Sequence, residues 1–162
     1  MGLLLLIGLI AAVDLAIKAE IEARDSSEFP KPLEIAKGKI ILHQSHNAGF
    51  PFEVLKNRPE LVRMLPIAVI SGLAGILGFL IPRKGFRGEK LALTLTLGGA
   101  LSNLYDRLTK NYVVDYFSID WKGLKKVIFN LGDICIFAGA ALMIVSQVVS
   151  ELRQMGKKAA KR

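Results

Sequence analysis

Cysteine and histidine are scarce in this sequence. Its 162 residues include one cysteine, Cys135, and two histidines, His43 and His46. A single cysteine excludes a framework of internal disulfides, and its place within an apolar run predicts a small buried side chain. The histidines form only a His-x-x-His pair outside the apolar runs, without the His-Glu-x-x-His helix of zinc peptidases. They therefore give little support for a metal site.

Acidic residues are outnumbered by basic ones, 14 to 22, which gives a formal net charge of +8. Such an excess can indicate nucleic-acid binding when it forms a basic patch. Here the excess comes from the short segment RKGFRGEK (83–90) and from ELRQMGKKAAKR (151–162), while residues 19–63 carry seven charges of each sign. This placement favours a membrane topology signal, and we expect no nucleic-acid partner.

Long apolar runs account for much of the chain, in which 52% of residues are hydrophobic. Four runs stand out: 2–19, 65–82, 91–108 and 127–150. Each is close to the roughly 20 residues that a helix needs to cross a bilayer. The sequence therefore predicts an α-helical membrane protein with four antiparallel transmembrane helices, folded as a single membrane domain over residues 1–162.

The basic segments also predict the orientation of the helices. Short basic loops stay in the cytoplasm, so 83–90 and the C-terminus are expected inside, and four spans then put the N-terminus inside as well. The first run lacks the charged leader of a secretory signal peptide and holds Asp14 and Lys18 one turn apart. We therefore expect an uncleaved first span.

The segments expected outside the membrane are 20–64 and 109–126. The first is too long for a simple connector, and its stretch GKIILHQS (38–45) has the β-branched composition of a strand. It predicts a small extracytoplasmic β-containing cap between the first and second helices. The second contains VVDYFSID, which suits a short strand or an interfacial segment with Tyr116 and Trp121 at the headgroup level.

Glycines recur in two of the apolar runs. Gly72, Gly75 and Gly78 lie in the second run, and Gly98 and Gly99 lie in the third. Small residues at such positions allow transmembrane helices to approach closely. We expect both groups to serve helix packing.

The third and fourth apolar runs each contain one aspartate. Both follow the pattern Asn-Leu-x-Asp, once from Asn103 to Asp106 and once from Asn130 to Asp133. The i,i+3 spacing puts the amide and the carboxylate on one helix face. The third helix runs outward and the fourth runs inward. We therefore expect Asp106, near an outer end, and Asp133, about two turns into its helix, to lie at similar depth.

Two carboxylates at the same depth in a membrane are expected to share a proton, as in the catalytic pair of an aspartic peptidase. An ionised carboxylate in hydrocarbon costs at least ~2.5 kcal/mol, and two that face each other also repel. Sharing one proton makes the pair tolerable and separates the two apparent pKa values. An aspartic peptidase uses that state, because one carboxylate activates water while the other polarises the scissile carbonyl.

The residues alone leave other interpretations open. Asp106 could pair with Arg107 or Lys110 at the interface, while Asp133 only caps its helix. The two acids could instead relay protons or bind cations in a small transporter or ion-conducting bundle, although such sites usually lie near mid-membrane. A serine or cysteine nucleophile is disfavoured because the four runs contain no histidine.

Five short motifs then occur in the order seen in one family. They are DLAIK with Asp14 and Lys18, NAGFPF with Asn47, Gly49 and Phe52, SNLYDR with Asn103, Asp106 and Arg107, VVDY with Asp115, and FNLGD with Asn130 and Asp133. In these motifs, and over nearly its whole length, the chain resembles lipoprotein signal peptidase, also called signal peptidase II.

The resemblance implies a membrane-embedded aspartyl endopeptidase of the bacterial cytoplasmic (inner) membrane, with its site near the outer face and no metal or organic cofactor. Its partners would be lipid-modified prolipoproteins, cut just before a cysteine that bears diacylglycerol, and membrane lipids. A globomycin-type inhibitor would bind at the catalytic pair, Asp106 and Asp133. The supporting and substrate-binding residues would be Asn47, Gly49, Asn103, Arg107, Asn130, Asp14, Lys18 and Asp115.

Three positions depart from the family's motifs. Ile17 replaces a hydroxyl residue, Ser102 replaces a glycine, and Gly132 replaces an alanine. The side chain of Ser102, next to Asn103, is expected to narrow the contact between the third and fourth helices. The departures leave both aspartates in place, and they keep open the alternative of a divergent paralogue with specialised substrates.

A second aspartyl class is a weaker match. Tyr105-Asp106 and Gly132-Asp133 partly imitate the Tyr-Asp and Gly-x-Gly-Asp motifs of presenilin and prepilin-peptidase proteins. The first glycine of the second motif is replaced by Asn130. Four spans are also too few for those larger proteins.

Overall fold

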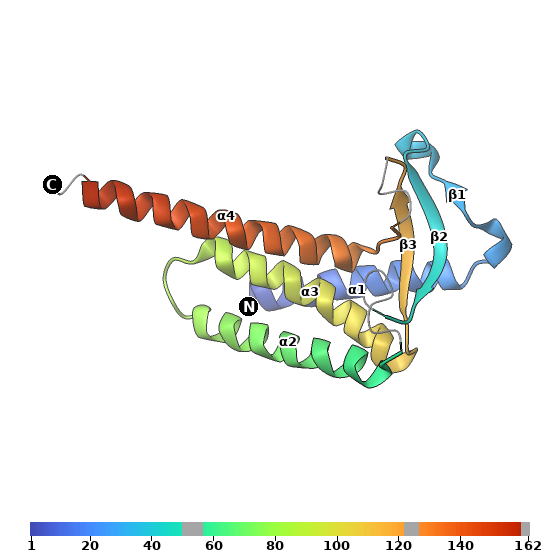
Figure 1. The fold of residues 1–162 in the computed structure, drawn as a ribbon, viewed down its shortest axis with the longest axis horizontal. Coiled ribbons are helices and arrows are strands. Elements are labelled where there is room, and N and C mark those ends of the chain that lie inside the picture. The colour runs from blue at the N-terminus through green and yellow to red at the C-terminus, as the bar shows by residue number, and fades with distance from the viewer. Residues whose placement is uncertain (50–56, 122–126, 160–162) are drawn as a thin grey trace.

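The computed structural model describes residues 1–49, 57–121 and 127–159. Four long helices lie alongside one another, and a small sheet stands across one end of them (Figure 1). The helices are α1 (Gly2–Glu22), α2 (Pro59–Leu80), α3 (Arg87–Thr109) and α4 (Leu131–Ala159). Both chain termini and the α2–α3 connection lie at the end away from the sheet. This is the alternating arrangement that four consecutive spans require.

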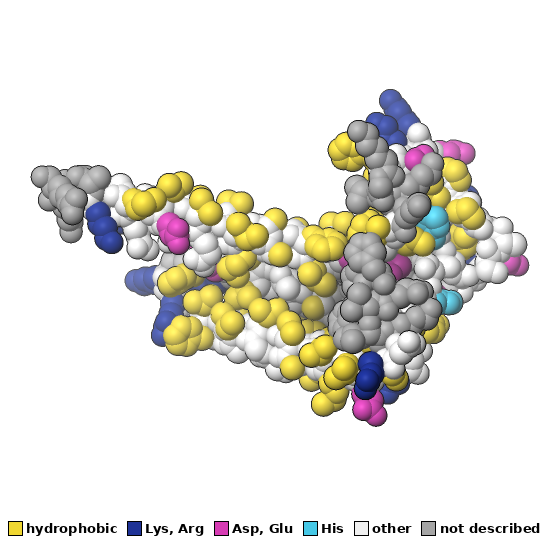
Figure 2. All heavy atoms as spheres, viewed as in Figure 1, with side chains coloured by type: hydrophobic (Ala, Val, Ile, Leu, Met, Phe, Trp, Pro, Cys, Tyr) yellow, Lys and Arg dark blue, Asp and Glu magenta, His cyan; other side chains and the backbone are white. Residues whose placement is uncertain are grey.

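Among the described residues, three helices are long and apolar enough to cross a membrane by composition, namely α1, α2 and α4. Their outward faces carry large exposed hydrophobic side chains, including Leu4, Leu9, Ile76, Phe79, Ile144 and Val148, and Figure 2 shows such side chains along the helices. An exposed apolar surface of this extent suits a lipid environment.

Helix α3 is less apolar because the other helices surround it. It packs against α1, α2 and α4, and Leu93 and Leu97 lie in its buried core. A helix that meets protein on several sides can carry polar residues that lipid would not accept. The contacts of α3 with the other three helices therefore explain how it can lie among them although its sequence is less apolar than theirs.

The sheet has three antiparallel strands in the order β1 (Lys31–Pro32), β2 (Ile40–Asn47) and β3 (Val113–Ile119). The strands predicted from GKIILHQS and VVDYFSID are confirmed. Strand β3 follows α3, so the cap combines both segments that were expected outside, not 20–64 alone. The β2–β3 register shifts between Leu42 and Ser45, and beyond the shift Ser45 pairs with Asp115.

The start of α4 differs from the expectation. The helix begins at Leu131, after Phe129 has paired with Phe117 of β3 in an isolated bridge. Asp133 therefore lies in the first turn of α4, and the prediction that it lies two turns into the helix was wrong. The backbone before it is held by the sheet and cannot join the helix.

Glycines permit close contacts of α3 with α1 and with α4, but the glycines of α2 do not take part in such contacts. A Cβ on Gly99 would overlap the carbonyl oxygen of Gly132, and a Cβ on Gly98 would lie 2.8 Å from Ile10. The packing role of these α3 glycines is confirmed. A Cβ on Gly72, Gly75 or Gly78 would meet open space, so the packing role predicted for the α2 glycines was wrong.

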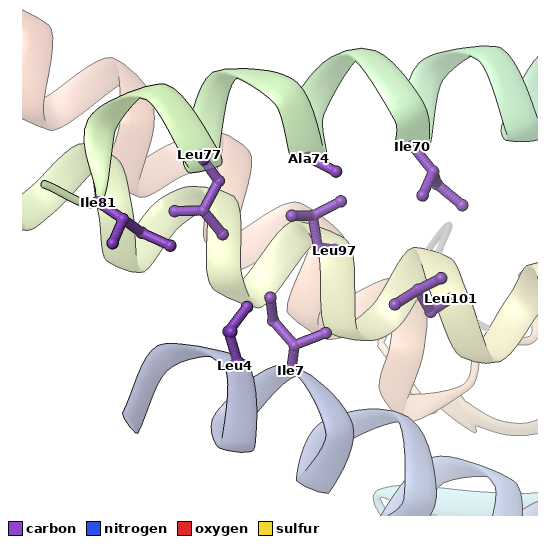
Figure 3. A pocket seen from close by; sticks show the side chains of 9 residues that line it. Leu4, Ile7, Ile70, Ala74, Leu77, Ile81, Leu97 and Leu101 are labelled. Atoms are coloured by element: carbon purple, nitrogen blue, oxygen red, sulfur yellow. The ribbon is translucent and has the colours of Figure 1, made fainter. Parts of the chain in front are cut away.

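An apolar groove of about 290 Å³ lies between α1, α2 and α3 (Figure 3). Its lining includes Leu4, Ile7, Ile70 and Leu97. No lining residue carries a charge or a side-chain hydrogen-bonding group. The groove therefore has no catalytic groups, and the candidate site lies elsewhere.

Candidate active site

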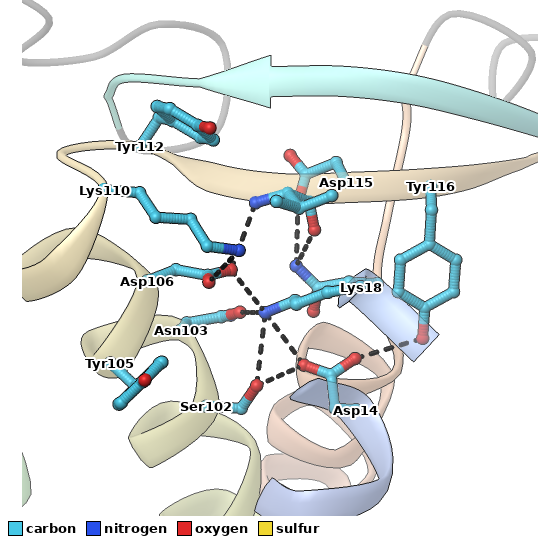
Figure 4. A network of polar contacts seen from close by, with 12 residues as sticks. Asp14, Lys18, Ser102, Asn103, Tyr105, Asp106, Lys110, Tyr112, Asp115 and Tyr116 are labelled. Atoms are coloured by element: carbon cyan, nitrogen blue, oxygen red, sulfur yellow. Dashed lines mark hydrogen bonds and ion pairs between the residues drawn. The ribbon is translucent and has the colours of Figure 1, made fainter. Parts of the chain in front are cut away.

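Polar side chains gather where the sheet meets the ends of the helices. Figure 4 shows α1, α3 and β3 directing side chains into one network. Many of these side chains are buried: the relative exposure is 0% for Asp14, Lys18, Ser102, Asp106 and Asn130, and between 5% and 8% for Asn103, Arg107 and Asp115. Buried polar groups in such number have to satisfy one another.

Lys18 is the centre of the network. Its Nζ lies 2.8 Å from Asp14 Oδ2 and 3.2 Å from Asp106 Oδ2. It also donates to Asn103 Oδ1 at 2.7 Å. A buried ammonium is tolerable only when opposite charges and acceptors surround it, and these contacts supply both. The i,i+4 spacing of Asp14 and Lys18 on α1 creates the first of these pairs.

Asp106 is held by cations on both of its oxygens. Its Oδ2 faces Lys18 and accepts the backbone N–H of Val114 at 3.2 Å. Its Oδ1 lies 3.1 Å from Lys110 Nζ, one turn further along the chain. The interfacial pairing with Lys110 that the sequence left open is therefore present. In this setting Asp106 ties the end of α3 to α1 and to β3.

Asp133 and Asn130 cap the start of α4. Asn130 Oδ1 accepts the backbone N–H of Asp133 at 2.8 Å, and Asp133 Oδ2 accepts the backbone N–H of Asn130 at 3.2 Å. This reciprocal pattern is a capping box, in which each side chain satisfies a backbone donor that the helix leaves free. The FNLGD motif therefore fixes the position of Asp133 through the helix terminus.

Asn103 links the α1 pair to Asp133. While its Oδ1 accepts from Lys18, its Nδ2 donates to Asp133 Oδ1 at 2.9 Å. The carbonyl oxygen of this amide therefore faces the Lys18 ammonium group, and its NH₂ group faces the Asp133 carboxylate. Asn103 of the first Asn-Leu-x-Asp motif is therefore hydrogen-bonded to Asp133 of the second.

Asp115 on β3 is joined to the same helix terminus. Asn130 Nδ2 donates to Asp115 Oδ1 at 2.7 Å, and Asn47 Nδ2 donates to Asp115 Oδ2 at 3.2 Å. Burial, together with the negative charge of Asp133, raises the pKa of Asp115 to about 6. A carboxyl group that titrates near neutral pH beside a second carboxylate is typical of an acid–base site.

The remaining predicted residues form the edge of the site. Arg107 donates from an Nη to the carbonyl oxygen of Gly49 at 3.1 Å. The backbone N–H of Gly49 donates to Asn47 Oδ1 at 3.0 Å, which holds that amide toward Asp115. The structure therefore brings Asn47, Gly49 and Arg107 together with Asp115, although Phe52 of the same motif lies outside the described residues.

Two members of the network were not expected. Tyr116, predicted at the headgroup level, is buried. Its hydroxyl donates to Asp14 Oδ1 at 3.0 Å and accepts the backbone N–H of Leu131 at 2.9 Å. Ser102 Oγ donates to Asp14 Oδ2 at 2.5 Å. The alternation of VVDYFSID gave no signal for Tyr116, because the residues from Val113 to Tyr116 are all buried in the strand.

The histidines and the cysteine have other surroundings. His43 Nε2 lies 2.8 Å from Ser118 Oγ, and His46 Nε2 lies 3.4 Å from Glu22 Oε1. Cys135, expected to be buried, is only partly covered. In the described ranges, no cluster of three or more His, Cys, Asp or Glu side chains could hold a metal ion.

Comparisons with known proteins agree on one family. A family model described as signal peptidase (SPase) II matches residues 6–149. The chain is 33% identical to a lipoprotein signal peptidase of Serratia marcescens over 158 residues, which covers 98% of this chain and 88% of that protein. It is 27% identical to a lipoprotein signal peptidase of Clostridium acetobutylicum, with 92% and 97% covered.

Solved structures support the fold independently. The chain superimposes on a bacterial membrane enzyme with a TM-score of 0.78, covering 93% of this chain and 89% of the other at 19% identity. A second bacterial membrane enzyme gives a TM-score of 0.75 at 21% identity. At such identities the likeness concerns the arrangement of helices and sheet alone.

Proposed function

The chain belongs to the signal peptidase II family of aspartic peptidases, and on that premise we propose that it cleaves diacylglyceryl-modified prolipoproteins just before the lipidated cysteine. Lipoprotein signal peptidase activity follows from the family and from the names of its relatives. The observation that carries the proposal is the single asparagine, Asn130, that hydrogen-bonds to both Asp115 and Asp133.

We propose Asp115 as the catalytic partner of Asp133, in place of Asp106. Asp106 is fully buried, and each of its oxygens lies against the ammonium group of a lysine, Lys18 or Lys110. Asp115 is held by amide groups and responds to the charge of Asp133 through its raised pKa. Asp106 stays a prediction from the sequence motif, and the substitutions below distinguish the two candidates.

The proposed reaction divides the work between the two carboxyl groups. The ionised one accepts a proton from water, whose oxygen attacks the scissile carbonyl carbon. The protonated one donates a hydrogen bond and then its proton to the carbonyl oxygen, which forms a tetrahedral intermediate. When the C–N bond breaks, the first carboxyl gives its proton to the departing amine, and the second takes a proton back from a hydroxyl group of the intermediate, which becomes the new carboxyl group. The pair ends in the protonation state in which it began.

Neighbouring residues keep this pair in position. Asn103 and the backbone N–H of Asn130 each donate to a different oxygen of Asp133, which orients its carboxylate. Lys18, balanced by Asp14 and Asp106, holds Asn103 in the orientation that presents its N–H. Arg107 and Gly49, at the edge of the site, suit contacts with the substrate backbone.

The protein is a bacterial multi-pass membrane protein, and we assign its orientation from the basic segments. The N- and C-termini are cytoplasmic, and the site faces the outer side of the cytoplasmic membrane. The signal segment enters from the lipid, its acyl chains stay in the bilayer, and the strand-containing cap lies over the scissile bond. A globomycin-type inhibitor competes for the same pair.

Cleavage of a lipid-modified prolipoprotein by the purified protein in detergent tests the proposal. Wild type should release the signal peptide, globomycin should block the release, and the unlipidated precursor should be a poor substrate. Asp115→Asn and Asp133→Asn should each lose at least about 10³-fold in kcat, while Asp106→Asn should retain measurable turnover with a lowered unfolding temperature. If Asp115→Asn is active and folded Asp106→Asn is inactive, Asp106 is the partner instead.

A further inference from the structure

Asp14 receives three side-chain donors, although it is remote in sequence from the proposed catalytic pair. Lys18 Nζ lies 2.8 Å and Ser102 Oγ 2.5 Å from Asp14 Oδ2. The Tyr116 hydroxyl donates to Asp14 Oδ1 at 3.0 Å. These donors come from α1, α3 and β3, and Asp14 itself is fully buried. The carboxylate therefore fixes three elements relative to one another.

The surroundings of Asp14 reach Asp133 by two routes. One passes through Lys18 to Asn103 Oδ1 at 2.7 Å, and the Nδ2 of that amide donates to Asp133. The other passes through Tyr116, which accepts the backbone N–H of Leu131 at 2.9 Å. Leu131 is the first residue of the helix that carries Asp133. A displacement of Asp14 would therefore also move the side-chain amide of Asn103 and the first residue of α4, Leu131.

Gly132 lies against the same oxygen that Ser102 binds. A Cβ at position 132 would lie 3.0 Å from Asp14 Oδ2, 3.0 Å from Asn130 Oδ1 and 2.9 Å from the carbonyl oxygen of Gly99. Asp14 Oδ2 cannot move away freely, because Ser102 Oγ and Lys18 Nζ already contact it. A methyl group at 132 and a hydroxyl at 102 therefore compete for the space around one carboxylate oxygen.

We propose that Ser102 is a positioning residue of the peptidase site, whose hydroxyl sets the place of the Asp14–Lys18 pair, and that this role depends on the missing side chain at Gly132. The Ser102 hydroxyl and a Cβ built at position 132 meet at one atom, Asp14 Oδ2. The inference rests on the proposed function for its catalytic consequence, but the coupling itself is a property of the fold.

A double-mutant cycle tests the dependence. Wild type, Ser102→Gly, Gly132→Ala and the double variant are compared for kcat and KM on a lipid-modified prolipoprotein in detergent, and for unfolding temperature. We expect Gly132→Ala to lower kcat at least about 10-fold and Ser102→Gly about threefold, both with little change in KM, because a small misplacement of catalytic groups is costly. The double variant should recover to within about threefold of wild type, with its unfolding temperature recovering in parallel.

The matched control is Ser118→Gly, alone and with Gly132→Ala. Ser118 is also a fully buried serine, but its hydroxyl contacts His43 outside the network. Its removal should leave the Gly132→Ala defect in place. Losses that multiply in the Ser102→Gly, Gly132→Ala double variant, or an equal rescue by Ser118→Gly, overturn the inference, since the contacts with Gly99 and Asn130 would then carry the defect.

The two proposals fail separately. A wild type that cleaves no lipid-modified prolipoprotein contradicts the proposed function. The cycle in unfolding temperature still decides whether Ser102 and Gly132 are coupled. A cleaving wild type whose two positions act additively in both kcat and unfolding temperature contradicts the inference alone.

Discussion

Asn130 and Asp133 each satisfy the backbone N–H of the other, at 2.8 and 3.2 Å. The same asparagine uses its Nδ2 to hold Asp115 at 2.7 Å. A helix cap and a carboxylate pair therefore share one residue. This arrangement explains why an asparagine, with one acceptor and two donors on its side chain, suits the position.

Asn130→Asp is expected to impair catalysis while it preserves the helix start. An aspartate can still cap the helix, but it cannot donate to Asp115 and adds a negative charge there. The pKa of Asp115 should rise further, and kcat should fall at least about 100-fold, with the acidic limb of its pH profile moved to higher pH. Steady-state kinetics across pH 4–9 measures both effects. An unchanged profile would separate Asn130 from the pair.

Lys18→Met is expected to destabilise the protein strongly. It leaves Asp14 and Asp106 buried with fewer opposite charges, and losing one partner of a buried ion pair costs roughly 3–5 kcal/mol. Unfolding in detergent measures the loss. Adding Asp106→Asn to Lys18→Met should restore part of it. Arg24→Met, which breaks the exposed pair with Glu20, is the control and should change little.

The raised pKa of Asp115 predicts a pH dependence of stability. Its pKa is about 6 in the folded protein, against 3.8 as the ordinary value. The folded state therefore binds the proton more tightly, and the contribution of Asp115 to stability falls as the pH rises from about 4 to about 6, by roughly 3 kcal/mol in all. The difference in unfolding free energy between wild type and Asp115→Asn should decline over that window and then level off. A flat difference would mean that Asp115 titrates normally.

Gly99→Ala should separate α3 from α4. Its Cβ would overlap the Gly132 carbonyl oxygen, and overpacking of this kind costs about 1–3 kcal/mol. Gly75→Ala is a matched control on α2, where a Cβ meets open space. That change should be neutral or stabilise by up to about 1 kcal/mol. Equal effects at the two positions would contradict the close contact at Gly99.

Arg107→Lys should weaken substrate binding more than turnover. A lysine keeps the charge but loses the planar guanidinium that contacts the Gly49 carbonyl oxygen. We expect KM to rise about 10-fold with kcat reduced less. Arg63→Lys, which alters the contact of an exposed arginine with Asn111, should leave both constants near wild type. A fall in kcat without a change in KM would move Arg107 into the catalytic group.

Much of the fold could be predicted because bilayer thickness limits the length of each span. The runs 2–19, 65–82 and 91–108 each lie largely within one helix, and the β-branched stretches formed the strands. The start of α4 was missed because it depends on a tertiary contact. Phe129 pairs with Phe117, and no local pattern announces a bridge between such distant residues.

The sequence predicted which residues gather in the site better than it predicted which of them contact one another. The repeated Asn-Leu-x-Asp pattern predicts Asp106 as the partner of Asp133, and this assignment stays a prediction. Sequence spacing does not show that Lys18 lies against Asp106. Lys18 lies 88 residues from Asp106 and yet neutralises it. Asp115 lies on a strand whose register decides its neighbours, so its contact with Asn130 could be seen only in three dimensions.

The encircled position of α3 also bears on how the chain enters the bilayer. A helix with charged residues toward both ends and a modest apolar content gains little from leaving the translocon alone. Helices α1 and α2 emerge first from the ribosome, and α4 emerges last. Stable insertion of α3 therefore depends on helices α1 and α2, which are already in the membrane, and on α4, which follows it, so the helix that supplies Asn103 and Asp106 is held on all its packed sides only after α4 has been made.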